Sequence, residues 1–185
     1  MTRRLTVILV VLLVVGCAGT DQEAPMNAEE IQIPLGGDPG EVAGHDWPTR
    51  DDGSRLDATA IEREHTAVLT SDGSEILRSD SQLTFLREHD DVVEQVTLTP
   101  LVDAGQLDDV IDAAEALLDG HDLLDDNARD DLAEFRGHTE DTQQWPAGRS
   151  TLRTSTRGSN VEVHVEIRPT GQDDWFYSLT VVPVR

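Results

Sequence analysis

Two stretches of the chain alternate between apolar and polar residues, the pattern of half-buried β-strands. The clearer one covers residues 161–167, where Val or Ile occupies every second position. With Gly158-Ser159 as a type II′ turn, this strand pairs with an earlier one and Leu152 lies opposite Val165. A last strand over residues 175–181 pairs with it on the other side. Because a slip of one residue would turn every side chain to the other face, the apolar face is well defined.

A second hairpin is predicted earlier in the chain. Asp90-Asp91 serves as its two-residue turn, since Asp enters positive φ more readily than most residues. This turn places Leu83 opposite Leu98 and Phe85 opposite Val96. We therefore expect these four side chains on the buried face of the sheet.

Residues 57–70 allow two interpretations. We expect a helix, because apolar residues share one helical face and Gly73 follows as a stop. The competing interpretation makes residues 66–70 a strand and residues 71–74 a hairpin turn.

Between the hairpins, apolar residues recur three and four positions apart in two segments that end near Gly120 and Gly137. The two stripes are Leu107, Val110, Ile111, Ala114, Leu117 and Leu118, followed by Leu124, Ala128, Leu132 and Phe135. Together these elements predict an α+β globular domain over residues 56–185. In it an antiparallel sheet of about five strands has two or three helices packed on one face.

The N-terminal region contains an apolar run, Leu5–Val15, that only Thr6 interrupts. It is too short to span a bilayer, which takes about 20 residues, but it suits the hydrophobic region of an export signal. The sequence Val14-Val15-Gly16-Cys17 resembles the lipobox of prokaryotic lipoproteins. This resemblance implies that residues 1–16 are a signal peptide and that the sulfur of Cys17 carries a lipid after cleavage.

The resemblance places the mature protein at the cell membrane, lipid-anchored through Cys17 and facing the exterior. Arg3-Arg4 leaves general secretion and twin-arginine export both open. Residues 17–55 hold four of the eight prolines and several glycines, without a persistent period. They predict a flexible acidic tether after the lipidated cysteine. Trp47 either docks on the domain or stays exposed in that tether.

The charge of the chain is strongly negative. It has 37 Asp and Glu against 14 basic residues, all of them Arg, and a formal net charge of −23. Without a basic face, nucleic acid is excluded as an ordinary partner. At about 1 M salt the screening length falls to ~3 Å, so dense carboxylates repel one another weakly. The lysine-free composition and the lipobox together resemble the surface lipoproteins of halophilic archaea, and a GC-rich actinobacterium is the other source left open.

Two patterns raise the possibility of metal binding. The acidic stretch Asp119–Asp131 lacks the alternating ligands and central glycine of an EF-hand. Glu162, His164 and Glu166 share one strand face, but Arg153, expected opposite His164, would repel a cation. We therefore interpret both patterns as solvated surface and expect no metal and no other cofactor. The nucleophile and metalloprotease motifs of common hydrolases are missing as well, so we do not expect an enzyme.

The aromatic residues suggest a speculative ligand cleft between sheet and helices, lined by Phe135, Trp145 and Tyr177. Three functions therefore remain open. The first is a lipid-anchored, non-enzymatic module that binds a protein or small ligand outside the cell. The second is a carrier of an apolar or lipid ligand, similar in outline to lipoprotein-carrier half-barrels. The third is a divalent-cation-dependent binding protein or enzyme. The oligomeric state is also open.

Overall fold

The computed structural model describes residues 29–42, 45–101, 106–141, 151–169 and 174–184, with the backbone alone for residues 138–141. This part of the chain contains eight strands, two α-helices and one 3₁₀ helix. In chain order they are β1 (Glu29–Pro34), the 3₁₀ helix (Pro39–Glu41), β2 (Ala58–Ile61), β3 (His65–Ser71), β4 (Ser74–His89), β5 (Val92–Pro100), α1 (Leu107–Asp119), α2 (Asp126–Asp141), β6 (Leu152–Arg157), β7 (Val161–Pro169) and β8 (Trp175–Pro183).

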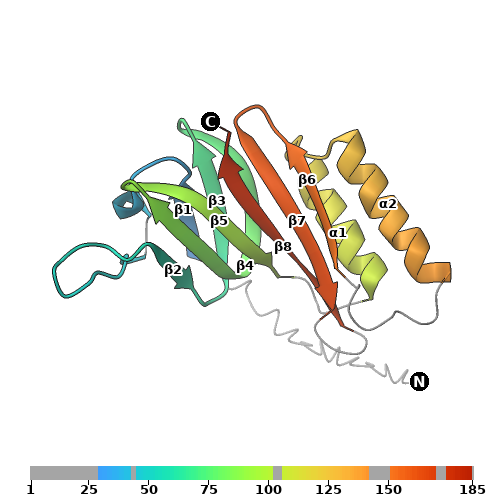
Figure 1. Cartoon of the computed structure of the whole chain (residues 1–185), viewed down its shortest axis with the longest axis horizontal. Helices are drawn as coiled ribbons and strands as arrows, with labels where there is room; N and C mark the ends of the chain where they lie inside the picture. Colours follow the sequence, from blue (N-terminus) through green and yellow to red (C-terminus); the bar gives the residue numbers. More distant parts are fainter. Residues whose placement is uncertain (1–28, 43–44, 102–105, 142–150, 170–173, 185) are drawn as a thin grey trace, which may run out of the picture.

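All eight strands belong to one twisted sheet with the order β1-β3-β4-β5-β8-β7-β6, and β2 pairs with the second half of β4 (Figure 1). Every pair is antiparallel except β1 and β3, which run parallel. The expected antiparallel sheet of about five strands is therefore wrong. The protein has a larger, mixed sheet, because three strands lie in segments that were predicted as tether or helix.

The two predicted helices are present and lie on one face of the sheet, toward its β6 end (Figure 1). Helix α2 packs against β6, while α1 packs against β8 and β7. Helix α2 continues past Gly137 to Asp141, beyond its expected end. In the described part of the chain, no helix is both long and apolar enough to cross a membrane.

The core lies between this sheet face and the elements that cover it. It is one connected cluster to which all the strands except β6, both helices and the segment after β1 contribute. The largest side chains that are fully buried are those of Ile31, Ile33, Leu69, Leu77, Leu86, Leu98, Ile111, Leu118, Leu132, Ile167, Leu179 and His65.

The helix expected over residues 57–70 is wrong, and the competing strand interpretation is correct. Residues 58–61 form β2 and residues 65–71 form β3, joined to β4 by a tight turn at Asp72-Gly73. Both turn residues have positive φ, 51° and 76°, which suits a two-residue hairpin. Strand β3 is paired on both sides, with β1 and β4. These long-range pairs outweigh the local helical spacing.

Strand β1, the first described element, begins at Glu29, well inside the segment predicted as a tether. Ile31 and Ile33 of β1 are fully buried, and β1 pairs with β3 along its whole length. Trp47 is also buried, and its indole Nε1–H donates to the carbonyl oxygen of Leu56 over 2.6 Å. The boundary between residues 55 and 56 is thus corrected. Of the predicted tether, residues 17–28 and 43–44 lie outside the described part of the chain.

The hairpin predicted around Asp90-Asp91 has the correct turn but the wrong pairing. Asp90 and Asp91 form the turn, with φ values of 54° and 60°. The register then shifts between Arg87 and Glu88, where β5 contains one extra residue, so Leu83 lies opposite Thr99 instead of Leu98. As a result, Leu83 and Phe85 are exposed and Leu86 is buried, contrary to expectation.

The hairpin predicted around Gly158-Ser159 has the expected faces in a different register. Leu152 pairs with Ile167, two residues beyond the expected Val165. Tyr177 of β8, also expected opposite Val165, likewise pairs with Ile167. A displacement of two residues keeps every side chain on its own face, because the side-chain period of a strand is two. The apolar residues of β7 are therefore buried as predicted.

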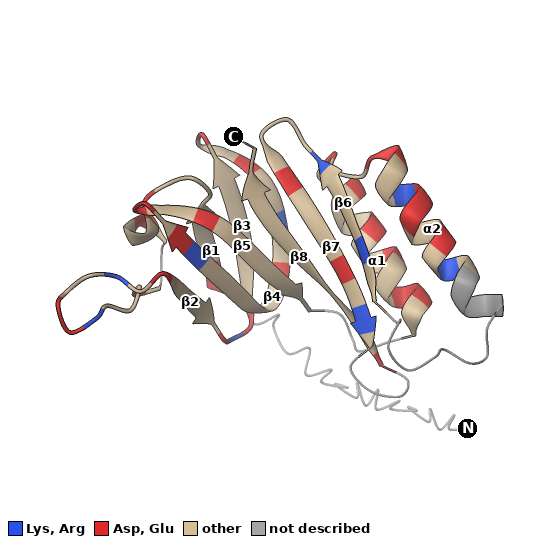
Figure 2. Ribbon diagram, in the orientation of Figure 1, with Lys and Arg blue, Asp and Glu red and all other residues tan. Residues whose placement is uncertain are grey.

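On the opposite, outer face, Arg78 links two carboxylates of the sheet, one on β1 and one on β4. Its guanidinium lies 2.7 Å from Glu30 of β1 and 2.9 Å from Glu75 of β4. Arg78 lowers the pKa of both carboxyl groups by hydrogen bonding and by its charge. Elsewhere acidic residues dominate the outward sides of α1 and α2 (Figure 2).

We expect Arg78 to make the attachment of β1 sensitive to acid. A carboxyl group whose pKa is lowered by folding stabilises the fold above its unfolded-state pKa and loses that contribution as the pH falls through its folded-state pKa. Below the usual Glu value of 4.5, the wild type should lose thermal stability more steeply than Arg78→Gln. Unfolding temperatures measured at a series of pH values test this. Parallel curves for the two proteins would contradict it.

Candidate functional site

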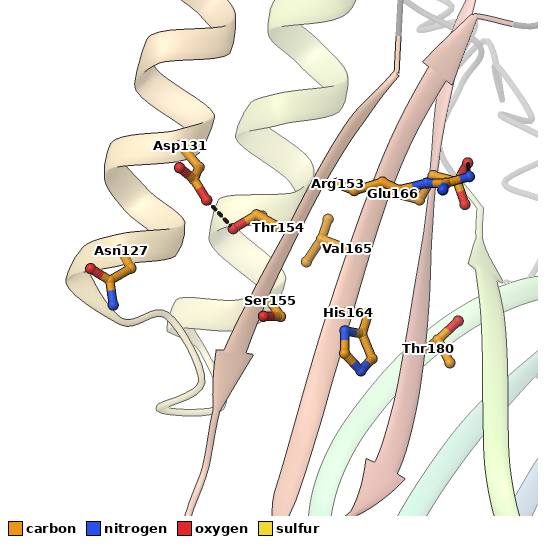
Figure 3. Close-up of a pocket in the computed structure, with 9 residues that line it drawn as sticks. All are labelled: Asn127, Asp131, Arg153, Thr154, Ser155, His164, Val165, Glu166 and Thr180. Carbon is orange, nitrogen blue, oxygen red and sulfur yellow. Dashed lines mark hydrogen bonds and ion pairs between the residues drawn. The ribbon is translucent and has the colours of Figure 1, made fainter.

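An open groove of about 600 Å³ lies beside strand β6 (Figure 3). The first turns of α2 form one wall, and strands β6, β7 and β8 supply the rest. Its lining is mostly polar and contains groups of both charge signs. The lining residues are Asn127, Asp131, Arg153, Thr154, Ser155, His164, Val165, Glu166 and Thr180.

The alternation of β6 and β7 places the polar residues of this groove in cross-strand pairs. Arg153 lies opposite Glu166, and Ser155 lies opposite His164. The expected pairing of Arg153 with His164 is therefore wrong, because the register is displaced by two residues. Instead, the Arg153 guanidinium lies 3.3 Å from a carboxylate oxygen of Glu166. Such an exposed ion pair contributes little to stability, ~0–1 kcal/mol, but it sets the charge pattern of the surface.

Two threonine hydroxyls hold the helical layer against β6. Thr154 donates to a carboxylate oxygen of Asp131 on α2 over 2.5 Å. Thr156 donates to the backbone carbonyl of Leu123, in the connection between the helices. At the start of α2, the Asp125 carboxylate accepts from the backbone N–H of Ala128 over 2.8 Å and caps the helix. These bonds fix the wall of the groove relative to the strands.

The groove does not contain an activated nucleophile among the residues that the structure describes. Ser155 and His164 are cross-strand neighbours, but His164 directs Nε2 toward Glu162, 3.6 Å away. Nucleophilic catalysis needs a base within hydrogen-bond reach of the nucleophile, about 2.6–3.2 Å. In this structure no hydrogen bond joins the described Ser155 and His164. The groove offers donors and acceptors for recognition.

The residues considered for metal binding do not converge. Within the described ranges, no group of three or more His, Cys, Asp or Glu side chains is placed to hold a metal ion. In the acidic stretch, Asp119 and Asp126 both face Arg129, at 3.4 and 3.9 Å. His121 contacts the backbone of Arg78 through Nε2 and so joins the helix connection to β4.

The three residues of the expected aromatic cleft have different positions. Phe135 is packed edge-to-face against Trp175, with ring centroids 6.0 Å apart. Tyr177 is buried in the core, and burial raises its pKa to about 12. Trp145 lies outside the described residues. Phe135 and Tyr177 therefore fill the interface between sheet and helices.

A buried polar pair that the sequence did not predict lies where β3 meets β4. His65 is fully buried, with Nδ1 2.7 Å from the carbonyl oxygen of Arg63 and Nε2 2.8 Å from the hydroxyl of Thr84. Nearby, His45 hydrogen-bonds Thr59, and partial burial lowers its pKa. With both ring nitrogens of His65 engaged, this pair is part of the architecture. No spacing motif connects residues so far apart in the chain.

Comparison with protein-family models, with curated proteins and with solved structures finds no match to this chain. Its function must therefore be argued from its own residues.

We expect the bond between Thr154 and Asp131 to stabilise the wall of the groove. Thr154→Val keeps the shape of the side chain and removes the hydroxyl, so the free energy of unfolding should fall by about 1 kcal/mol. The matched control Ser155→Ala, at an exposed neighbouring position, should change it far less.

Urea unfolding of Thr154→Val, Asp131→Ala and the double variant forms a double-mutant cycle. The double variant should lose less stability than the two single losses added together. Strict additivity would show that the two side chains do not interact.

Proposed function

We propose that the chain is an extracytoplasmic protein, anchored to the membrane by a lipid on Cys17, whose folded domain binds a partner without catalysing a reaction. The observation that carries this proposal is the apolar run Leu5–Val15 followed directly by Gly16 and the single cysteine of the chain. An apolar run of this length suits an export signal, and Cys17 stands where a lipobox has its modified residue.

The position of the fold agrees with an anchored protein. Strand β1 begins at Glu29, twelve residues after Cys17. At no more than 3.3–3.6 Å per residue, that segment reaches about 40 Å at full extension. A lipid on Cys17 would therefore keep the start of β1 close to the membrane.

The groove beside β6 supports a binding role. It is open and polar, and it presents an Arg153–Glu166 pair together with His164. A ligand that carries both hydrogen-bond donors and acceptors could take the place of either member of the Arg153–Glu166 pair. We do not propose the apolar carrier function, because Phe135 and Tyr177 are packed in the core.

The acidic composition supports a saline environment. With 37 acidic residues and no lysine, the surface repels itself strongly unless salt screens it. Screening at about 1 M salt acts over ~3 Å, which is shorter than the spacing of most surface charges. We propose a halophilic source on this basis.

Mass spectrometry of the protein extracted from membranes of its native host tests the anchor. The mature chain should begin at Cys17 and carry the added mass of a lipid on that residue. Cys17→Ser is the control, and it should accumulate with its leader attached and without lipid. Wild-type protein that starts at Met1 and carries no lipid would refute the proposal.

A further inference from the structure

Three exposed apolar side chains, Leu83, Phe85 and Leu101, lie together on the outer face of the sheet, and we name them the outer apolar patch. Their exposed fractions are 37, 40 and 42 %. We propose that the outer apolar patch rests on the lipid bilayer that holds the anchor of this protein. The proposal depends on the proposed function, because the anchor brings the patch to the membrane.

A shift in the alternation of β4 places the patch on the outer face. Leu77, Ser79 and Ser81 are buried, but after Gln82 the buried positions become Thr84 and Leu86. The pairing with β5 is irregular at the same point, between Ser81 and Leu83. A regular strand would bury Leu83 and Phe85 and expose Thr84. The bulge therefore turns two large apolar residues to solvent where a polar residue would otherwise stand.

The patch is continuous across β4 and β5. Leu83 lies opposite Thr99, and Phe85 lies between Thr97 on β5 and Ala60 on β2. Leu101 follows Thr99 by two positions, and its backbone N–H donates to the carbonyl oxygen of Asp80. The cross-strand neighbours of Leu83 and Phe85 are small and uncharged.

The patch also lies close to the point where the chain enters the fold. A row of backbone partners runs from Glu29 through His65 and Ser81 to Pro100, so these four residues are level across four strands. Neighbouring strands are about 4.8 Å apart, which puts Ser81 about 10 Å from Glu29. The end of β5 and the beginning of β1 lie at the same end of the sheet (Figure 1).

The anchor restricts how far this end can move from the membrane. The segment from Cys17 to Glu29 reaches about 40 Å at full extension, which is comparable to the size of a domain of this length, whose radius of gyration is about 15 Å. The end of the sheet that carries Glu29 is therefore the end that meets the bilayer most often.

The charge of the chain explains why the contact would be apolar. At −23, the protein is repelled by anionic lipid headgroups and cannot use a basic patch to bind them. The free energy of leucine and phenylalanine side chains falls when they enter the boundary between headgroups and acyl chains, whatever the lipid charge. Among the described residues, the other large apolar side chain that is exposed to a similar degree is that of Leu56, at 37 %. It lies next to Asp57, whose carbonyl oxygen accepts from Glu88 near the far end of β4.

The test compares a label at Leu83 with one at Leu56. The lipid-modified chain is prepared as Leu83→Cys and as Leu56→Cys, and the new thiol is labelled with an environment-sensitive dye, since Cys17 is the single native cysteine. Each protein is bound to vesicles of equal parts phosphatidylcholine and phosphatidylglycerol that contain acyl-chain nitroxide lipids, in about 1 M salt to screen the charges. We expect quenching at position 83 to exceed quenching at position 56 several-fold.

A second arm removes the anchor. Residues 17–185 carrying Cys17→Ser are mixed with the same vesicles, and the partition coefficient is measured by flotation. The partition coefficient should fall roughly tenfold when the three substitutions Leu83→Ser, Phe85→Ser and Leu101→Ser are added, because less apolar surface enters the bilayer. The control Leu56→Ser should leave it unchanged, and circular dichroism verifies that each variant is folded.

Equal quenching at the two positions, or equal partition of the triple variant and its control, would overturn the proposal. So would a stable dimer of the wild type that the triple variant cannot form, since the patch would then be covered by a second copy of the chain. If native protein carries no lipid on Cys17, the proposed function fails by itself. The partition measurement then still decides whether the outer apolar patch binds lipid.

Discussion

The buried face of the sheet must stay on one side through six successive strand pairings and the added pairing of β2 with β4, although the chain does not alternate regularly. An irregularity in the pairing of β4 with β5, between Ser81 and Leu83, makes this possible. It lets Leu77 and Leu86 face the same core although they are an odd number of residues apart. The helical stripes, β1 and the buried His65 are all arranged against this one face. The same irregularity turns Leu83 and Phe85 outward, so one constraint accounts for both the core and the outer apolar patch.

The outer face follows from the acidity of the chain. Some of its few arginines contact more than one carboxylate, as Arg78 does with Glu30 and Glu75. On the helices, Arg136 lies within 4 Å of Asp108, Asp112 and Glu115. The groove beside β6 continues this arrangement with Arg153 and Glu166. An acidic protein of this kind has polar groups for recognition in a groove and apolar side chains for contact at a patch. Its net negative charge excludes a general electrostatic attraction to anions.

Periodicity in the sequence predicted the faces of the strands far better than their partners. The apolar stripes of α1, α2 and β7 were correct because the side-chain period depends on local sequence alone. The predicted registers were wrong for two reasons. A turn that lies one residue later in the chain changes the partner of every residue in the hairpin. A bulge leaves no signal in the composition of the sequence. Strand β1 was missed because Ile31 and Ile33 stand among prolines and glycines, and its partner β3 follows only after a long connection. In the groove, the positions of Glu162, His164 and Glu166 on one outer face were predicted, whereas the bond from Thr154 to Asp131 joins residues that only the folded chain brings together.

The proposed orientation at a membrane depends most on β1 being an integral strand, because β1 shortens the connection to Cys17. Native-state hydrogen exchange of the β1 amides, followed by NMR, tests this most directly. The β1 amides that pair with β3 should exchange as slowly as the amides between β3 and β4, since one cooperative sheet opens as a unit. Exchange of the β1 amides at the rate of an unfolded chain, with β3 and β4 still protected, would contradict the account.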